Sequence, residues 1–138
     1  MEDLKCPFRQ ALLPGDFGCS HAQPVTRREG PDIACGSAEA HDRCGELLAR
    51  LREVGLPALG YTDDLNELPH AVAVKVQMGG LLGLRRLLDP PSAASTVVED
   101  VGATVAQAVA RYGSTVAVPY AELVPDMASY RLKRRRGR

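Results

Sequence analysis

Tryptophan is absent from this sequence, and aromatic residues make up only 4% of it. Proteins that bind single-stranded nucleic acid usually stack bases on several aromatic side chains, so the composition disfavours that class of interface. The acidic N-terminus contains no apolar segment, and a signal peptide is therefore not expected. No hydrophobic run is long enough for a transmembrane helix. Together these absences predict a cytoplasmic protein with no transmembrane segment.

Recognisable catalytic motifs are missing as well. The sequence contains no G-x-S-x-G, no H-E-x-x-H and no calcium-binding loop. The glycines in residues 79–83 resemble a phosphate-binding turn only in outline, because no Gly-Lys-Ser/Thr follows them. Close packing of the backbone explains these glycines better. The sequence therefore favours a protein that is not an enzyme.

What the sequence does contain is a concentration of cysteine near the N-terminus. Four cysteines occur in the first third of the chain and none follows them, and each has a proline or glycine neighbour: Cys6-Pro7, Gly18-Cys19, Cys35-Gly36 and Cys44-Gly45. Such neighbours let the backbone pass close to a group held by the sulfur atoms. In a reducing compartment, clustered cysteines indicate metal or redox chemistry before structural disulfides.

The spacing of the cysteines separates the possible uses. Structural zinc sites usually take two ligands from a C-x2-4-C pair, but the intervals here contain 12, 15 and 8 residues. An iron–sulfur cluster has its cysteines at separate corners, although the common ferredoxin spacings are absent. We expect Cys6, Cys19, Cys35 and Cys44 to bind one iron–sulfur cluster, [4Fe–4S] in type, with zinc and free redox thiols as alternatives. Cys44 is also compatible with an ordinary place in the core.

Two histidines lie near cysteines in the sequence. His21 follows Cys19 by two residues, and His41 precedes Cys44 by three. Either could replace a cysteine or donate a hydrogen bond to a ligand, but a solvent-facing or core position explains them equally simply. His70 is interpreted as a loop residue.

Residues 1–36 are expected to form a loop-rich lobe, because proline and glycine interrupt them repeatedly. The clearest helix follows over 38–54, capped by Ser37 and ended by Gly55. Its apolar positions include Cys44, which should face inward.

The remaining elements are expected to alternate between strands and helices. Alternation of apolar residues predicts a strand over 71–78, with weaker strands over 56–61 and 114–120. Thr96 and Glu99 form a possible capping box for a second long helix over 96–112. A short helix over 81–88 and an acidic turn over 62–69 complete the prediction.

The sequence thus predicts an α+β fold, a small mixed sheet packed by two or three helices. One domain is expected over 1–130, divided into the cysteine-bearing lobe (1–36) and an α+β body (37–130). A basic tail follows at 131–138, with six positive charges against a net charge of −6 in the preceding residues. The predicted function is electron transfer to a protein redox partner, or redox sensing. The alternative is a zinc-stabilised or cluster-dependent regulator that binds nucleic acid through the tail.

Overall fold

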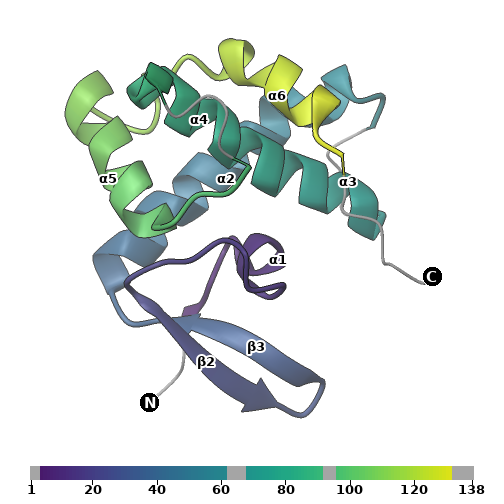
Figure 1. Cartoon of the computed structure of the whole chain (residues 1–138), viewed down its shortest axis with the longest axis vertical. Helices are drawn as coiled ribbons and strands as arrows, with labels where there is room; N and C mark the ends of the chain where they lie inside the picture. The colour runs from purple at the N-terminus through teal and green to yellow at the C-terminus, as the bar shows by residue number, and fades with distance from the viewer. Residues whose placement is uncertain (1–3, 62–67, 92–95, 132–138) are drawn as a thin grey trace.

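The computed structural model describes residues 4–61, 68–91 and 96–131. It confirms the α+β class: a small antiparallel sheet lies below a layer of helices (Figure 1). The term lobe refers to residues 4–36, and the term body refers to the described residues from 37 onward. Most of the tail lies outside the described residues, as do Asp63, Asp64 and Glu67 of the predicted acidic turn. The division of the chain into one domain and a tail stays a prediction.

The sheet belongs to the lobe, which corrects the expectation of loops there. Strand β1 (Leu4–Lys5) and strand β2 (Ala22–Arg27) both pair with β3 (Gly30–Cys35), and all pairs are antiparallel. Pro24 in β2 and Pro31 in β3 are the reason why the sequence predicted loops in place of this hairpin. Pro24 lies on an edge strand, and β1 reaches only the last two residues of β3, so the edge of β3 beside Pro31 is unpaired. Proline is tolerated at such edges because no ladder hydrogen bond is lost there.

Helix α2 (Ala38–Ala58) confirms the strongest prediction from the sequence. The Ser37 side chain accepts a hydrogen bond of 3.2 Å from the N–H of Ala40, as expected of an N-cap. The helix continues past Gly55 to residue 58, so it includes the first residues of the strand predicted over 56–61. Gly55 is instead a packing position, because a Cβ atom there would lie 2.7 Å from the Met127 sulfur.

The predicted strand over 71–78 is wrong. Residues 70–88 form one helical rod made of α3 (His70–Val74), a π-helical segment η1 (Lys75–Gly79) and α4 (Gly80–Leu88). The apolar alternation arises because this rod is buried on several sides. Gln77, in the π segment, is buried and accepts a hydrogen bond of 3.2 Å from the N–H of Ala11 in the short helix α1 (Arg9–Leu12).

The glycines at 79, 80 and 83 therefore belong to a helix and not to a phosphate-binding turn. A Cβ atom at Gly79 would lie 2.6 Å from the Cα atom of Met127, and one at Gly83 would lie 2.6 Å from Asp126 Oδ2. Both contacts are with helix α6 (Val124–Ser129). The glycines thus allow α6 to pack directly on the backbone of the rod.

Helix α5 (Val101–Tyr112) begins later than predicted. Its N-cap is Asp100, whose side chain accepts a hydrogen bond from the N–H of Ala103, and the predicted capping box is not formed. Gly113 ends the helix with a φ of +92°, as the sequence indicated. The predicted strand over 114–120 is absent. A turn leads instead to the short helix η3 (Tyr120–Leu123), where the Tyr120 hydroxyl donates to the carbonyl of Thr115.

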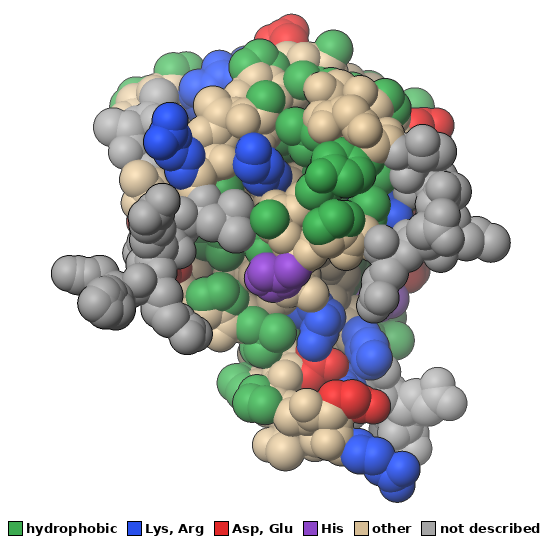
Figure 2. Space-filling view, turned by 90° about the vertical axis from the view of Figure 1, so that its right-hand side faces the viewer, with side chains coloured by type: hydrophobic (Ala, Val, Ile, Leu, Met, Phe, Trp, Pro, Cys, Tyr) green, Lys and Arg blue, Asp and Glu red, His purple; other side chains and the backbone are tan. Residues whose placement is uncertain are grey.

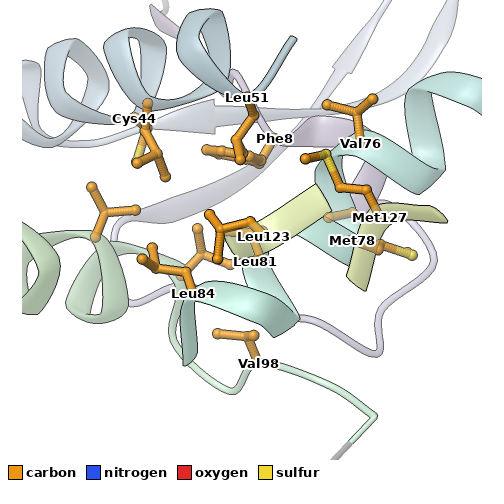
Figure 3. Close-up of a cluster of buried hydrophobic side chains, with 14 of the residues drawn as sticks. Phe8, Cys44, Leu51, Val76, Met78, Leu81, Leu84, Val98, Leu123 and Met127 are labelled. Atoms are coloured by element: carbon orange, nitrogen blue, oxygen red, sulfur yellow. The ribbon is translucent and has the colours of Figure 1, made fainter. Parts of the chain in front are cut away.

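Lobe and body share one apolar core. Leucine and valine side chains from α2, α4 and α5 pack together, and Phe8 of the lobe joins them (Figure 3). The hairpin of β2 and β3 projects away from this core, with charged side chains near its tip (Figures 1 and 2). Strand β2 contains no fully buried residue. The hairpin is joined to the body at its base, where β3 leads into α2, and Phe8 and α1 of the lobe pack directly on the core.

Candidate metal centre

Three of the four cysteines come from the same end of the sheet. Cys35 ends β3, and it pairs with both Leu4 and Ala22. Cys6 follows β1, and its N–H donates to the carbonyl of Ile33 at 3.0 Å. Cys19 precedes β2, and its carbonyl accepts a hydrogen bond of 3.1 Å from the N–H of Ala22. The antiparallel pairing therefore brings together thiols that are far apart in the sequence.

The fourth thiol comes from the body. Cys44 lies on the inward face of α2, is 7% exposed, and belongs to the buried cluster shown in Figure 3. Gly36 and the Ser37 cap connect β3 directly to this helix. Because α2 starts immediately after the strand that carries Cys35, its second turn returns Cys44 toward the sheet. The predicted inward orientation of Cys44 is confirmed.

Electrostatic coupling shows that the four thiols occupy one region. Burial raises the pKa of the Cys44 thiol to about 12, and repulsion from Cys6, Cys19 and Cys35 contributes to the rise. Burial also raises the pKa of Cys6 to about 11, against a hydrogen bond from the Phe8 N–H that lowers it, with repulsion from Cys19 and Cys35 adding to the increase. Each of these repulsions is between cysteines at least nine positions apart in the sequence. The fold thus gathers sulfur atoms whose ionised forms repel one another.

Without a bound cation, the four neighbouring cysteines favour the neutral thiol form. With a bound cation, they favour the thiolate form. A bound metal reverses the pKa preference, because ligand thiols bind as thiolates and release their protons. All four cysteines are free of disulfides. The Cys35 sulfur donates to the carbonyl of Ser37 at 3.2 Å. The donor set is therefore four sulfur atoms, which suits soft metals and iron–sulfur clusters.

Among the described residues, the thiols do not form a compact site for a single ion. Within the described ranges, no group of three or more His, Cys, Asp or Glu side chains is arranged to hold a single metal ion. The histidines do not complete one either. His41 Nδ1 lies 3.7 Å from Asp42 Oδ1 on α2, and His70 is an exposed residue at the start of α3. His21 lies near Cys19, because both side chains face Gly102.

The start of α5 forms a further wall of the site, which the sequence did not predict. A Cβ atom at Gly102 would lie 3.0 Å from the Cys19 sulfur and 2.9 Å from Cδ2 of His21. The Val101 N–H donates to the carbonyl of Gly18 at 2.8 Å. The sequence offered one signal for this contact, a glycine within the helix predicted over 96–112. That signal gains meaning only when the position of Cys19 is known.

Asp100 fixes the other side of the Cys19 segment. One of its carboxylate oxygens, Oδ1, accepts hydrogen bonds from the N–H of Ser20 at 3.1 Å and from that of Ala103 at 3.2 Å. The same side chain therefore caps α5 and holds the residue that follows Cys19. Through Asp100, the body determines where this thiol lies.

A buried carboxylate lies next to the site in the lobe. Asp32 is 4% exposed and accepts hydrogen bonds of 2.6 Å from the Nε atoms of both Arg9 and Arg27. The hydrogen bond from Arg9 is the main cause of a pKa for Asp32 well below its usual range, and the Ile33 N–H and Arg27 add to it against the opposing effect of burial. The sequence analysis missed this residue, because Asp32 follows a glycine and a proline that suggested a loop. The ion pairs hold α1 against both strands of the hairpin.

Comparisons of the chain with family models, with curated proteins and with solved structures found no match. In the part of the chain that the structure describes, no helix has the length and apolarity needed to cross a bilayer. The chemistry of the four thiols is accordingly the main indication of function.

Proposed function

We propose that this protein binds one iron–sulfur cluster, [4Fe–4S] in type, through Cys6, Cys19, Cys35 and Cys44, and that it acts in electron transfer or redox sensing. The observation that carries the proposal is the convergence of all the cysteines of the chain on one region from four separate segments. Four buried or half-buried thiols that repel one another when ionised need a strong positive charge to become stable ligands. The proposal includes a reducing, cytoplasmic location, because a cluster and its free thiols require one.

The sequence spacing of the cysteines supports a cluster over a single zinc ion, because no two of them form the C-x2-4-C pair that usually supplies zinc ligands. Four thiolates on one zinc lie about 2.3 Å from the metal, and hence roughly 4 Å from one another. Among the described residues, no group of three or more His, Cys, Asp or Glu side chains has such an arrangement. An iron–sulfur cluster is larger and takes one cysteine at each corner, so it fits thiols that come from separate segments.

The surroundings of the thiols also suit a cluster. Such a group supplies one-electron exchange, and its reduction potential depends on burial and on hydrogen bonds to the sulfur atoms. The protein contributes the N–H of Phe8, which donates to the Cys6 sulfur, and the apolar core around Cys44. The Phe8 N–H would stabilise the thiolate of Cys6, whereas the apolar core would exclude water from one side of the site and so influence the potential.

Metal analysis after anaerobic purification tests this proposal. We expect iron and acid-labile sulfide in about equal amounts, together with a visible absorption band that bleaches in air. Each of the variants Cys6→Ser, Cys19→Ser, Cys35→Ser and Cys44→Ser should lose most of the iron and the sulfide. His70→Ala provides the control, because His70 is exposed and is not among the proposed ligands, so its loss should leave the metal content unchanged.

Two results would overturn the cluster. One zinc per chain with no sulfide would assign the four cysteines to a structural zinc site. Protein that binds neither iron nor zinc after reconstitution would leave redox-active thiols as the function of the site. In that case the four cysteines should form disulfides reversibly on mild oxidation, which mass spectrometry would detect.

A further inference from the structure

Arg43 directly precedes Cys44 in the second turn of α2, and its Nε atom is buried. Within the described residues, this buried N–H has no hydrogen-bond partner. We propose that Arg43 is the counter-ion of the proposed centre, where it offsets the negative charge of the group held by the four thiolates and raises the reduction potential of that group. This role rests on the proposed function, because only a bound group gives Arg43 a negative charge to offset.

Arg43 differs from arginines elsewhere in the body, which are paired with carboxylates. Arg86 forms an ion pair of 2.7 Å with Asp126. On α2 itself, Arg50 forms one of 3.3 Å with Glu53. In the part of the chain that the structure describes, no ion pair includes Arg43. Its positive charge is therefore not offset by contact with a described carboxylate.

The sequence of α2 offers Arg43 two carboxylates with which it does not pair. Glu39 precedes it by four residues and Glu46 follows it by three, the spacings at which opposite charges on a helix are neighbours. Neither of these two described residues forms an ion pair with Arg43, and Glu46 accepts a hydrogen bond of 2.8 Å from the Thr115 hydroxyl. The Nε atom of Arg43 is buried instead. This part of the side chain therefore packs against the protein and does not form the surface pair that the helix allows.

The charge of Arg43 acts on the neighbouring thiol. Burial raises the pKa of Cys44, repulsion from the three other thiols adds to the rise, and the positive charge of Arg43 opposes it. A guanidinium stays protonated in proteins. Arg43 therefore favours the thiolate form of Cys44 without itself exchanging a proton.

A group held by four thiolates has the charge that Arg43 lacks. The thiolates carry more negative charge than a zinc ion or a [4Fe–4S] core carries positive charge, so the bound group is an anion. A partly buried anion is unfavourable unless a cation or a hydrogen-bond donor lies nearby, and the guanidinium of Arg43 is both. When a one-electron donor reduces the cluster, the group gains one further negative charge and no proton. A neighbouring cation therefore favours the reduced form.

The arginines of the lobe fit this role less well, because they already share a carboxylate. The Nε atoms of Arg9 and Arg27 both lie 2.6 Å from Asp32. The charge of Asp32 is one of the smaller causes that raise the pKa of Cys6, after burial, so on this side of the site a negative charge acts on the thiol. A counter-ion for the bound group is therefore better supplied by Arg43 of the body.

Potentiometric titration of the full chain, purified anaerobically with its iron, tests this role. Arg43→Met keeps an apolar side chain but removes the charge, whereas Arg43→Lys keeps the charge. With dithionite as the electron donor, we expect one-electron reduction to be about tenfold less favourable in Arg43→Met, which is a potential lower by about 59 mV. Arg43→Lys should restore most of this difference. Arg50→Met is the matched control, because it removes the same charge from an exposed pair on the same helix and should change the potential little.

A second measurement uses the metal-free protein and does not depend on the cluster. Cobalt(II) binds to thiolates with a characteristic visible absorption, so a titration at constant pH gives the affinity of the cysteines for a single ion. Because binding releases protons and creates an anion, Arg43→Met should weaken it about tenfold, and Arg50→Met should not. Urea denaturation of the same samples shows whether Arg43 merely supports the fold. Removal of a buried donor that lacks an acceptor should not lower the midpoint of the metal-free protein.

The possible results separate the role of Arg43 from the proposed function. A cluster with the same potential in the wild type and in Arg43→Met, or an equal shift in Arg50→Met, would overturn the counter-ion and leave the cluster. If Arg43→Met assembles no cluster, assembly in Arg43→Lys supports the role of the charge, and failure of both variants overturns it. If the wild type binds cobalt but no cluster, weaker cobalt binding in Arg43→Met alone would retain the counter-ion and reject the cluster. Binding of neither would overturn both.

Discussion

The hairpin and the helical body obtain their order from different sources. Helices α2, α4 and α5 bury leucine and valine side chains along their length, whereas β2 buries no residue completely. The Asp32 ion pairs join β3 to α1 and to the end of β2, and the contacts of the Cys19 and Cys35 segments hold the base of the hairpin. Because the hairpin buries little apolar surface, polar contacts and any group that the thiols bind contribute more of its stability. The proposed site lies where the two parts meet, with Cys44 in the apolar core and the other three cysteines in the lobe.

Removal of the proposed metal should produce the largest difference in stability between the hairpin and the helical body. Chelation, or the variant Cys35→Ser, is expected to open the hairpin while the rod of residues 70–88 stays folded, because metal-binding free energy in the lobe is folding free energy. Hydrogen exchange measures both parts together. Amides of β2 and β3 should lose at least about tenfold in protection, equivalent to 1.4 kcal/mol, and those of the rod should change little.

The control for this experiment is Thr26→Ser, which alters an exposed position in β2 without touching a thiol. Equal protection of the hairpin with and without metal would show that the lobe packs independently of the centre. Loss of protection throughout the chain would show instead that lobe and body unfold as one unit.

Loss of the buried charge in the lobe should have an intermediate effect. Asp32→Asn leaves Arg9 and Arg27 without their shared carboxylate, and we expect a cost of about 1–3 kcal/mol in the free energy of unfolding. This is less than the 3–5 kcal/mol typical of a fully buried pair, because the two arginine side chains are 36% and 21% exposed. Urea denaturation at neutral pH measures the cost. Asp42→Asn, at an exposed position, should change stability by no more than about 0.5 kcal/mol.

The same carboxylate predicts a dependence on pH. Because the pKa of Asp32 is lower in the folded protein than in the unfolded chain, its contribution is fully present above an unfolded pKa of about 3.9 and is lost as the pH falls below that value. Stability measured between pH 6 and pH 3 should therefore fall more steeply in the wild type than in Asp32→Asn. Parallel curves would mean that Asp32 does not provide this acid sensitivity.

The smallest expected effect concerns the contact between α5 and the Cys19 segment. Gly102→Ala places a methyl group 3.0 Å from the Cys19 sulfur, and we expect a loss of about 1 kcal/mol, the lower end of the overpacking range, together with a lower iron content. Gly45→Ala is the matched control, because it is also a glycine in a helix but nothing lies within 4 Å of the added atom. That variant should gain about 0.5–1 kcal/mol from helix propensity. A gain in both variants would show that α5 does not constrain Cys19.

Local signals in the sequence were sufficient for part of the body. Ser37 and the apolar positions around Cys44 identified α2, and Gly113 marked the end of α5. These features depend on neighbours within one or two helical turns, so they can be detected without knowledge of the fold. The error over residues 71–78 has the opposite origin. A helix buried on several sides loses its 3.6-residue pattern, and alternating valines then resemble a strand.

For the candidate site, the sequence by itself determined the donors and the tertiary structure determined their arrangement. The four cysteines and their proline and glycine neighbours were evident at once, because residue type alone sets ligand chemistry. Their convergence depends on antiparallel register and on the return of α2, which involve residues at least nine positions apart. The contacts of Asp32 with Arg9 and of Gly102 with Cys19 join residues even further apart in the sequence. Contacts of that range are fixed only by packing of the whole chain, which local sequence patterns do not encode.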